Sequence, residues 1–196
     1  MKNAVLSMLT VGAIAFSFVG CNQNNLLSLL ADNSHHTITI SEQPKLVCQK
    51  EKDPNSNQYI PATYAWTPQR KKAIVLWKSQ YFKASGYDPQ KRCQEASPRF
   101  DKAYQNGRLN GYITRGKLNK IPVICAVNLA GKKCNNSNLL ITLRPGDNSQ
   151  EIIDHLQNTL SGNANSPLEH TYPSSPRLPK STNINGQEYY KVDFKF

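Results

Sequence analysis

The sequence predicts an α+β domain in which a mainly antiparallel sheet carries two packed helices and is stapled by disulfide bonds. Short runs rich in β-branched and aromatic residues are joined by short polar links, a pattern typical of antiparallel strands. Two longer stretches repeat apolar residues at intervals of three and four, the spacing of one helical face. Four cysteines follow residue 40, and an even number indicates a disulfide framework in a compartment that permits oxidation.

Several runs have the composition of strands, and they are residues 37–40, 45–48, 60–66, 73–77, 112–114, 121–127 and 139–143. The link 67–72 is polar enough to turn the third and fourth runs into a hairpin with a basic tip. The last three runs are predicted to form an antiparallel meander, because the links between them are short. Residues 123–127 and 139–143 are almost entirely apolar, which places both runs in the interior of the sheet.

The first helix is predicted to begin after Asp88, a good N-cap. Pro89 then takes the first helical position, where its missing N–H removes no hydrogen bond. Pro98 conflicts with the interior of a helix, so either the helix kinks there or Ser97 caps a second short helix. Gly107 ends the helix in both cases.

The second helix is predicted over residues 149–161. Asn148, with Glu151 three positions later, resembles a capping box. The apolar face of this helix consists of Ile152, Ile153, Leu156 and Leu160. Gly162 follows the last turn and closes the helix.

The start of the chain resembles a bacterial lipoprotein signal peptide. Lys2 supplies a positive charge, residues 5–18 form an apolar run, and the small residue Gly20 precedes Cys21. We therefore expect cleavage after residue 20 and attachment of lipid, including palmitate, to Cys21. The alternative is an uncleaved membrane-spanning helix, but the run is slightly short of the about 20 apolar residues that such a helix needs.

These features divide the chain into five parts. Residues 1–20 are the signal peptide, residues 21–36 a polar tether, and residues 37–162 the folded domain. Residues 163–185 are rich in Asn, Ser and Pro, which predicts a flexible linker with little structure. Residues 186–196 alternate in character, which predicts a C-terminal strand with one buried face that returns to the edge of a sheet.

Two disulfides are predicted among Cys48, Cys93, Cys125 and Cys134, because lipid is expected to take the first cysteine of the chain. Three pairings are open. Cys125 and Cys134 flank a turn-like segment at residues 128–131, which favours a bond between them and leaves Cys48 with Cys93. We expect both bonds to be structural, because the Cys-x-x-Cys spacing of redox sites does not occur.

The chain is strongly basic, with a formal net charge of +11, and loss of residues 1–20 removes only Lys2 among the charged residues. The residues expected to form one basic surface are Arg70, Lys71, Lys72, Arg115, Lys117, Lys132 and Lys133. Such a surface attracts acidic partners. In an exported protein the partners are expected to be anionic lipid headgroups or acidic polysaccharide, and nucleic acid is not expected.

No residue pattern indicates a cofactor, a metal site or a catalytic site. His35 and His36 are adjacent, so in a strand they point to opposite faces, and no other ligand residue stands at a suitable spacing. No phosphate-binding loop of the Gly-x-x-x-x-Gly-Lys type occurs. The alternative hypothesis is an envelope hydrolase built around Ser149 and His155, although no Gly-x-Ser-x-Gly turn surrounds the serine.

A series of motifs follows in a characteristic order, and they are Trp77–Phe82, Gly86–Cys93, Ser97–Phe100, Leu109–Thr114, Ile121–Cys125, Cys134 and Leu140–Gly146. Together with Cys48 they resemble the cyanobacterial circadian oscillating protein family over roughly residues 46–160, with the tether and the tail outside the resemblance. The resemblance implies a membrane-associated protein whose biochemical activity is not established. It contributes no catalytic residues.

The sequence as a whole predicts a non-catalytic protein of the cell envelope, anchored by lipid on the exported side. Its basic surface is expected to face anionic membrane or an acidic partner. The two features act together, because one acyl chain binds membrane only marginally and a basic patch supplies a second source of affinity.

Overall fold

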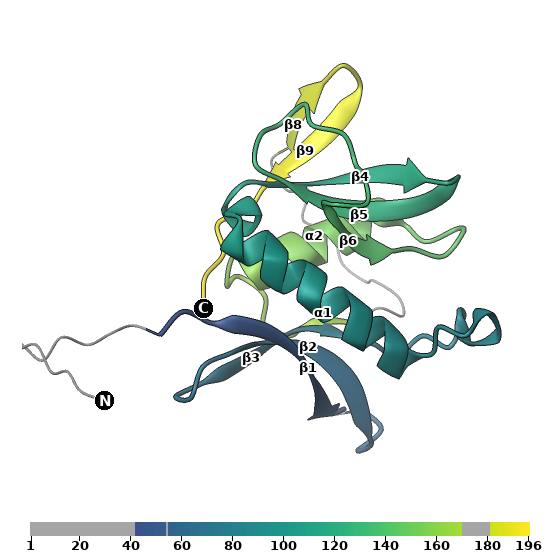
Figure 1. Ribbon diagram of the computed structural model, residues 1–196, viewed down its shortest axis with the longest axis vertical. Helices are drawn as coiled ribbons and strands as arrows, with labels where there is room; N and C mark the ends of the chain where they lie inside the picture. The colour runs from purple at the N-terminus through teal and green to yellow at the C-terminus, as the bar shows by residue number, and fades with distance from the viewer. Residues whose placement is uncertain (1–41, 54, 170–180) are drawn as a thin grey trace, which may run out of the picture. The chain divides into compact units, whose positions relative to one another are not determined.

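The computed structural model describes residues 42–53, 55–169 and 181–196. In chain order the strands and long helices are β1 (Lys45–Lys52), β2 (Tyr59–Trp66), β3 (Lys71–Leu76), α1 (Pro89–Gln105), β4 (Tyr112–Leu118), β5 (Ile121–Val127), β6 (Leu139–Thr142), α2 (Ser149–Leu160), β7 (Leu168–Glu169), β8 (Ser181–Ile184) and β9 (Gln187–Lys191). Short 3-10 helices η2 (Lys83–Ser85) and η3 (Arg108–Asn110) precede and follow α1. The predicted α+β class is confirmed (Figure 1).

The strands form two sheets rather than one. The first has the order β1-β2-β3-β7, in which only the short β3–β7 pair is parallel. The second has the order β6-β5-β4-β9-β8, and all its pairs are antiparallel. The hairpin between β2 and β3 and the meander of β4, β5 and β6 are both confirmed. The predicted strand 37–40 lies outside the described residues.

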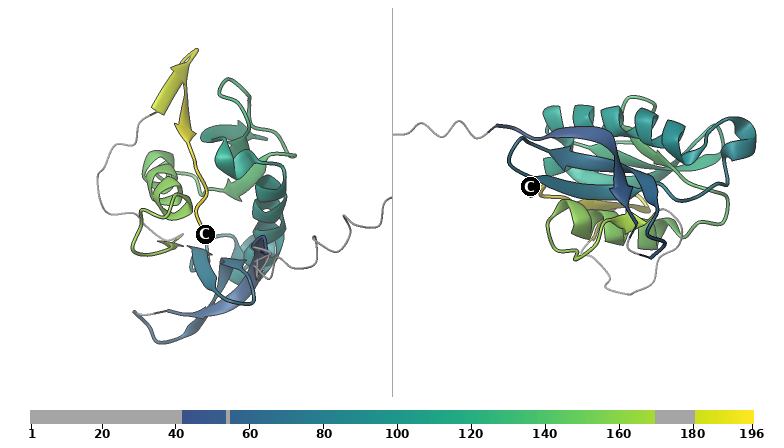
Figure 2. Two further views of the ribbon diagram at one scale, coloured as in Figure 1. Left: turned by 90° about the vertical axis from the view of Figure 1, so that its left-hand side faces the viewer. Right: turned by 90° about the horizontal axis from the view of Figure 1, so that it is seen from below.

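The two helices hold the sheets together. α1 packs against β1 and β2 of the first sheet and against β6 of the second, whereas α2 contacts β3 and β7 of the first and β4, β5 and β9 of the second. Figure 2 shows the helices on opposite sides of the C-terminal segment. The core is therefore continuous between the sheets, and residues from both contribute to it, including Ile74, Phe100, Ile113, Ile124 and Leu156.

The first helix begins as predicted and then continues past its proline. The Asp88 carboxylate accepts a hydrogen bond of 2.8 Å from the backbone N–H of Lys91, which caps the first turn. Pro98 lies inside a single α1, on its exposed side. The alternative in which Ser97 caps a second helix is wrong, because α1 continues without interruption through residue 97. The Ser97 hydroxyl instead lies 2.9 Å from that of Thr63 on β2.

Part of the predicted linker has regular structure. Residues 168–169 pair with β3, and residues 181–184 form β8, which pairs with β9. Few large apolar residues were visible in this segment, but Leu168 is 1% exposed and joins the shared core. Pairing with existing strands supplies the backbone hydrogen bonds that composition alone does not reveal. Residues 170–180 lie outside the described part.

The C-terminal strand also differs from its prediction. β9 ends at Lys191 and lies between β4 and β8, so it is an internal strand, and β8 forms the edge. Beyond β9 the chain leaves the sheet, and the N–H of Phe194 donates to the carbonyl of Leu109. The alternation of buried residues fails at Tyr189 and Tyr190, which are both buried. A strand covered on both faces buries consecutive side chains.

β6 occupies the other edge of the second sheet, although its apolar run predicted an interior position. Leu140 and Ile141 are fully buried all the same, and α1 packs beside the strand. Burial by a helix and burial by neighbouring strands leave the same apolar pattern in the sequence. Within the described ranges no helix is long and apolar enough to span a membrane.

Candidate functional site

Two disulfides cross-link the domain, one between a strand and a helix and one between a strand and a loop. Cys48 on β1 is bonded to Cys93 on α1, with 5.5 Å between their Cα atoms. Cys125 on β5 is bonded to Cys134 in the loop before β6, with 5.6 Å between the Cα atoms. Of the three pairings that the sequence left open, the favoured one is confirmed.

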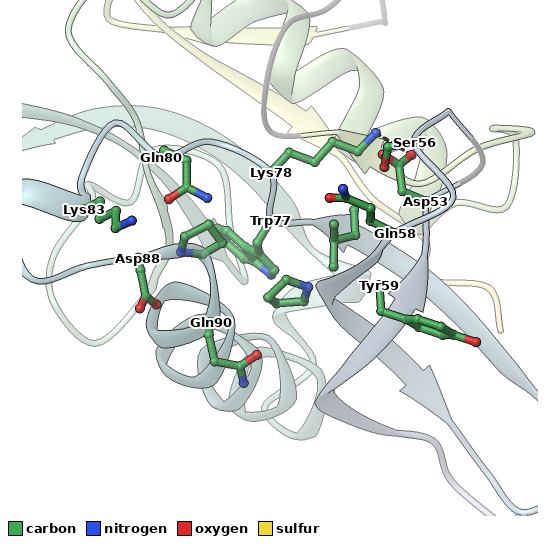
Figure 3. A pocket seen from close by; sticks show the side chains of 13 residues that line it. Asp53, Ser56, Gln58, Tyr59, Trp77, Lys78, Gln80, Lys83, Asp88 and Gln90 are labelled. Carbon is green, nitrogen blue, oxygen red and sulfur yellow. Dashed lines mark hydrogen bonds and ion pairs between the residues drawn. The ribbon is translucent and has the colours of Figure 1, made fainter.

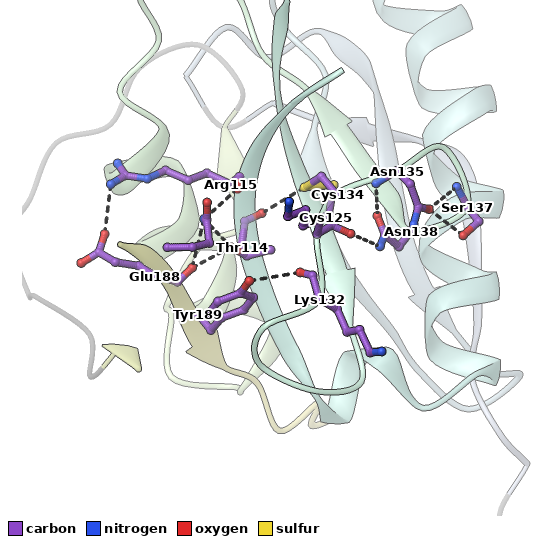
Figure 4. The surroundings of a disulfide bond; sticks show 12 residues. Thr114, Arg115, Cys125, Lys132, Cys134, Asn135, Ser137, Asn138, Glu188 and Tyr189 are labelled. Atoms are coloured by element: carbon purple, nitrogen blue, oxygen red, sulfur yellow. Dashed lines mark hydrogen bonds and ion pairs between the residues drawn. A yellow bond between two sulfur atoms is a disulfide. The ribbon is translucent and has the colours of Figure 1, made fainter. Parts of the chain in front are cut away.

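The second disulfide holds a loop over the outer face of the second sheet. Cys134 lies on Gly116 of β4 so closely that a Cβ atom at residue 116 would be 2.7 Å from the Cys134 sulfur. Next to it, the side-chain oxygen of Asn138 accepts from the N–H of Asn135, which closes the loop end (Figure 4). The glycine therefore permits the close approach of loop and strand.

A basic hollow of about 370 Å³ lies beside this loop. Its lining includes Lys117 from β4 and Lys132 and Lys133 from the loop, and we call this pocket the basic hollow. All three lysines are exposed, and within residues 42–53, 55–169 and 181–196 none of their ammonium groups forms an ion pair. Their charges are therefore available to an anion from solvent.

Arg115 contributes less to this hollow than its position in the sequence predicts. Its guanidinium points away from Lys132 and forms an ion pair of 3.1 Å with Glu188 on β9 (Figure 4). The floor of the hollow is a closed network, in which the Gln187 amide donates to the hydroxyl of Thr114 at 2.8 Å. A bound anion would therefore meet lysines at the rim and satisfied polar groups below.

The three remaining predicted basic residues belong to the hairpin of β2 and β3 in the other sheet, and two of them contact the end of the chain. The Lys72 ammonium donates to the carbonyls of Thr159 and Lys195, at 2.7 and 3.1 Å. Burial, and then the charge of Arg70, lower the pKa of Lys72. The Arg70 guanidinium lies 4.2 Å from the centre of the Phe196 ring. This hairpin therefore holds the C-terminal segment in place.

Lys71 also belongs to that hairpin, and it lies within β3 rather than in the turn. It faces Glu51 at 3.9 Å and the ring of Tyr64 at 5.0 Å. The seven basic residues expected on one surface are thus divided between the two sheets. Turn position in the sequence did not distinguish them, because turns of different sheets have the same composition.

A polar pocket at the end of the first sheet contains a compact charge cluster. The Lys78 ammonium lies 2.9 Å from Asp53 (Figure 3). It also lies 2.8 Å from Glu169 of β7. Burial lowers the pKa of Lys78, but the hydrogen bonds and charges of Glu169 and Asp53 outweigh it and raise the pKa overall. The hydrogen bonds from Lys78 and then from Ser56 lower the pKa of Asp53 to about 2.

This cluster is expected to make stability depend on pH in the acid range. A carboxyl group whose pKa falls on folding stabilises the protein above its unfolded pKa of 3.8 and loses that effect as the pH falls towards 2. The difference in free energy of unfolding between the natural chain and Asp53→Asn should therefore be constant above about pH 5 and shrink towards pH 2. Urea denaturation at a series of pH values measures it. A difference that does not change between pH 5 and pH 2 would contradict this role.

An apolar pocket of about 510 Å³ lies between α1, the segment 77–87 and the β5–β6 region. Its deepest residues, Trp77, Leu140 and Ile141, are buried. Its rim carries Tyr81 and Tyr87, which are 55% and 42% exposed. We call it the aromatic pocket.

A buried arginine forms part of the wall of the aromatic pocket. The guanidinium of Arg92 lies 5.0 Å from the centre of the Trp77 ring and 4.9 Å from that of Phe82. It also donates to the carbonyl of Ser79 at 3.4 Å. Burial lowers the pKa of Arg92 to about 10, against the opposing effect of the Asp147 charge. The side chain therefore stays positive at neutral pH between two aromatic rings.

The sequence offered one signal for the aromatic pocket. The motifs Trp77–Phe82, Gly86–Cys93, Ile121–Cys125 and Leu140–Gly146 each supply residues to its lining. The sequence did not predict that these motifs share one location, because they are separated along the chain and meet only after folding. Arg92 follows Lys91, and consecutive basic residues are typical of a solvated surface, but Arg92 is only 7% exposed.

The residues of the hydrolase hypothesis do not come together. Ser149 and His155 lie six positions apart on α2, which separates them by about 9 Å along the helix axis. The Nε2 atom of His155 lies 3.2 Å from the carbonyl of Ser166. In the described part of the chain, no group of histidine, cysteine, aspartate or glutamate residues is placed to hold a metal ion. His35, His36 and Cys21 lie outside the described residues.

The fold and its cross-links define a disulfide-stapled α+β domain with a basic hollow and an aromatic pocket. Residues 45–195 match the family model described as circadian oscillating protein COP23, and the chain belongs to this family. The match extends beyond residue 160 through β9, so the tail is part of the family domain and the narrower range expected from the motifs is corrected. No curated protein and no solved structure is significantly similar to the chain.

Proposed function

We propose that the chain is a non-catalytic protein of the cyanobacterial cell envelope, anchored by lipid at Cys21 and held against anionic lipid headgroups by the basic hollow. The basic hollow carries this proposal, because three lysines that have no ion-pair partner among the described residues converge there. Each lysine near an anionic surface adds about 1 kcal/mol of attraction. Lipid and lysines together would give a stable attachment, which a single acyl chain does not provide.

The two disulfides support the exported location. Such bonds persist in oxidising compartments and are rare in the cytosol. One of them bridges residues 45 positions apart, so it is part of the framework of the domain. The apolar run that ends at Cys21 supplies a route of export and a site for lipid.

The intact mass of the natural protein from a membrane fraction tests the anchor and the compartment together. We expect loss of residues 1–20, added lipid mass at Cys21 and no thiol that reacts before reduction. An unprocessed chain with reactive thiols would contradict the proposal, because it would face a reducing compartment.

Vesicle binding tests the basic hollow without the contribution of lipid. The chain from residue 22 onward should bind phosphatidylcholine vesicles that contain phosphatidylglycerol, and binding should weaken as salt rises. The double variant Lys132→Gln/Lys133→Gln should bind at least about tenfold more weakly. The matched control is Lys50→Gln/Lys102→Gln, which removes two exposed lysines elsewhere and leaves the hollow intact.

Equal weakening by both pairs would mean that net charge rather than the hollow drives binding. Binding to phosphatidylcholine vesicles that contain no anionic lipid, at the same strength, would show that anionic headgroups are not the partner. Soluble polygalacturonate would be added at constant ionic strength. If it displaces the chain from the vesicles, the lysines would instead be assigned to acidic polysaccharide. The variant His155→Ala should bind vesicles unchanged.

A further inference from the structure

Exposed apolar side chains are concentrated at the aromatic pocket. In the described part of the chain, six large apolar side chains are exposed, and Tyr81, Tyr87 and Ile121 among them line this one pocket. Scattered exposed apolar residues need no explanation, but a cluster around a cavity indicates a binding site. The cavity volume of about 510 Å³ is within the range of small-molecule sites, about 300–1,000 Å³.

The rim of the pocket is held in shape by the backbone. The N–H of Tyr87 donates to the carbonyl of Phe82 at 3.0 Å, which closes the segment around η2. Gly86 takes a φ of +79°, a conformation that favours glycine and allows this turn. The rings of Tyr81 and Phe82 meet edge to face at 4.9 Å. A rim ordered before binding lowers the entropy cost of taking up a ligand.

The charges that line the pocket favour a negative ligand. The lining contains Arg92, Arg99 and Glu95. Beside it the charges of Asp147 and Arg144, which form an ion pair of 2.7 Å with each other, act on Arg92, so three cations are set against two carboxylates. The Arg99–Glu95 pair lies one helical turn apart on α1 with 3.4 Å between nitrogen and oxygen, and both side chains are about one-third exposed. A net positive charge beside apolar walls strengthens attraction to an anion, because water is partly excluded there.

We propose that the aromatic pocket binds a small planar aromatic molecule that carries one carboxylate. The aromatic body would lie among Tyr81, Phe82 and Tyr87, where ring–ring contacts add to the burial of apolar area. The carboxylate would lie towards the arginine side of α1, since guanidinium groups match its geometry. This site is separate from the basic hollow, and the proposal does not depend on membrane attachment.

The test uses 2-naphthoate as the probe and the full chain in phosphatidylcholine nanodiscs. Titration calorimetry, with empty nanodiscs subtracted, should show saturable binding of one naphthoate per chain. The uncharged analogue 2-naphthylmethanol has the same ring system and should bind at least about fivefold more weakly. That difference measures the contribution of the charge.

Variants of exposed rim residues locate the site without disturbing the core. Tyr81→Ser/Tyr87→Ser should weaken naphthoate binding at least about tenfold. The control Tyr59→Ser/Leu129→Ser removes two exposed apolar side chains that are 69% and 62% exposed outside the pocket, and should leave binding unchanged. Arg99→Gln should reduce the preference for naphthoate over the alcohol. Thermal unfolding of each variant verifies that it is folded.

Several results would overturn the proposal. Absence of saturable naphthoate binding, or equal binding by the rim variant and its control, would remove the site. Equal affinity for the acid and the alcohol would show that the charge has no role. Binding of laurate with no binding of naphthoate would assign the pocket to aliphatic chains instead. Vesicle binding through the basic hollow is measured separately, so either proposal can fail alone.

Discussion

Replacing Cys48 and Cys93 together by alanine is expected to lower the free energy of unfolding by about 4 kcal/mol. The bond closes a loop of 45 residues between β1 and α1, and its removal frees the unfolded chain to explore many more conformations. The comparison is Cys125→Ala/Cys134→Ala, whose bond spans only 9 positions and is expected to contribute about 3 kcal/mol by the same relation. Urea denaturation under oxidising conditions measures both.

The order of the two effects is the informative result. Cys93 is also fully buried, so its truncation adds a small packing loss to the larger entropic term. Reduction of the natural chain should reproduce most of the combined loss. If the shorter bond contributes as much as the longer one, loop entropy is not the source of stabilisation. If removal of the Cys125–Cys134 bond loosens only the loop over β4, amide hydrogen exchange should become faster in that loop while the global free energy of unfolding stays the same.

Replacing Thr63 by valine is expected to lower the free energy of unfolding by about 2 kcal/mol. The Thr63 hydroxyl accepts a hydrogen bond of 3.0 Å from the indole N–H of Trp77 and lies 2.9 Å from the hydroxyl of Ser97. All three residues are buried, so water cannot replace the lost partner. Valine keeps the shape of the side chain and removes only the polar atom.

The matched variant is Thr63→Ser, which keeps the hydroxyl and removes one buried methyl group at a cost of about 1 kcal/mol. Denaturation of both variants separates the polar from the apolar contribution. A valine variant that is as stable as the natural chain would show that the hydroxyl contributes nothing. The same variants bear on the aromatic pocket, because Thr63 orients the Trp77 ring at its base.

Local signals in the sequence predicted most of the helices and strands. Asp88 and Pro89 marked the start of α1, and the side chain of Asn148 accepts hydrogen bonds at the start of α2 as its capping pattern indicated. Pro98 misled, because the cost of a proline depends on where it lies. On the exposed side of α1, the carbonyl that loses its partner can bond to water, and packing of the opposite face maintains the helix.

The sites were less accessible to sequence reasoning. The turn between Cys125 and Cys134 favoured the observed disulfide pairing among the three that were open, because a bond across a turn is a local feature. The basic surface was only partly predicted. Four of its seven residues line the hollow, and one of these, Arg115, is held in an ion pair, while Arg70 and Lys72 bind the C-terminal segment. Charge alone does not show which cations already have partners.

By itself the sequence determined the α+β class, the caps of both helices, the meander of β4, β5 and β6, and the cysteines available for cross-linking. These depend on periodicity, on turn residues and on counting, all of which act over a few positions. Only the tertiary structure decided that the strands form two sheets, that β9 lies between β4 and β8, and that Arg92 is enclosed by two rings. The physical reason is that sheet order, burial and pocket formation depend on contacts between distant segments, and such contacts leave no period in the chain.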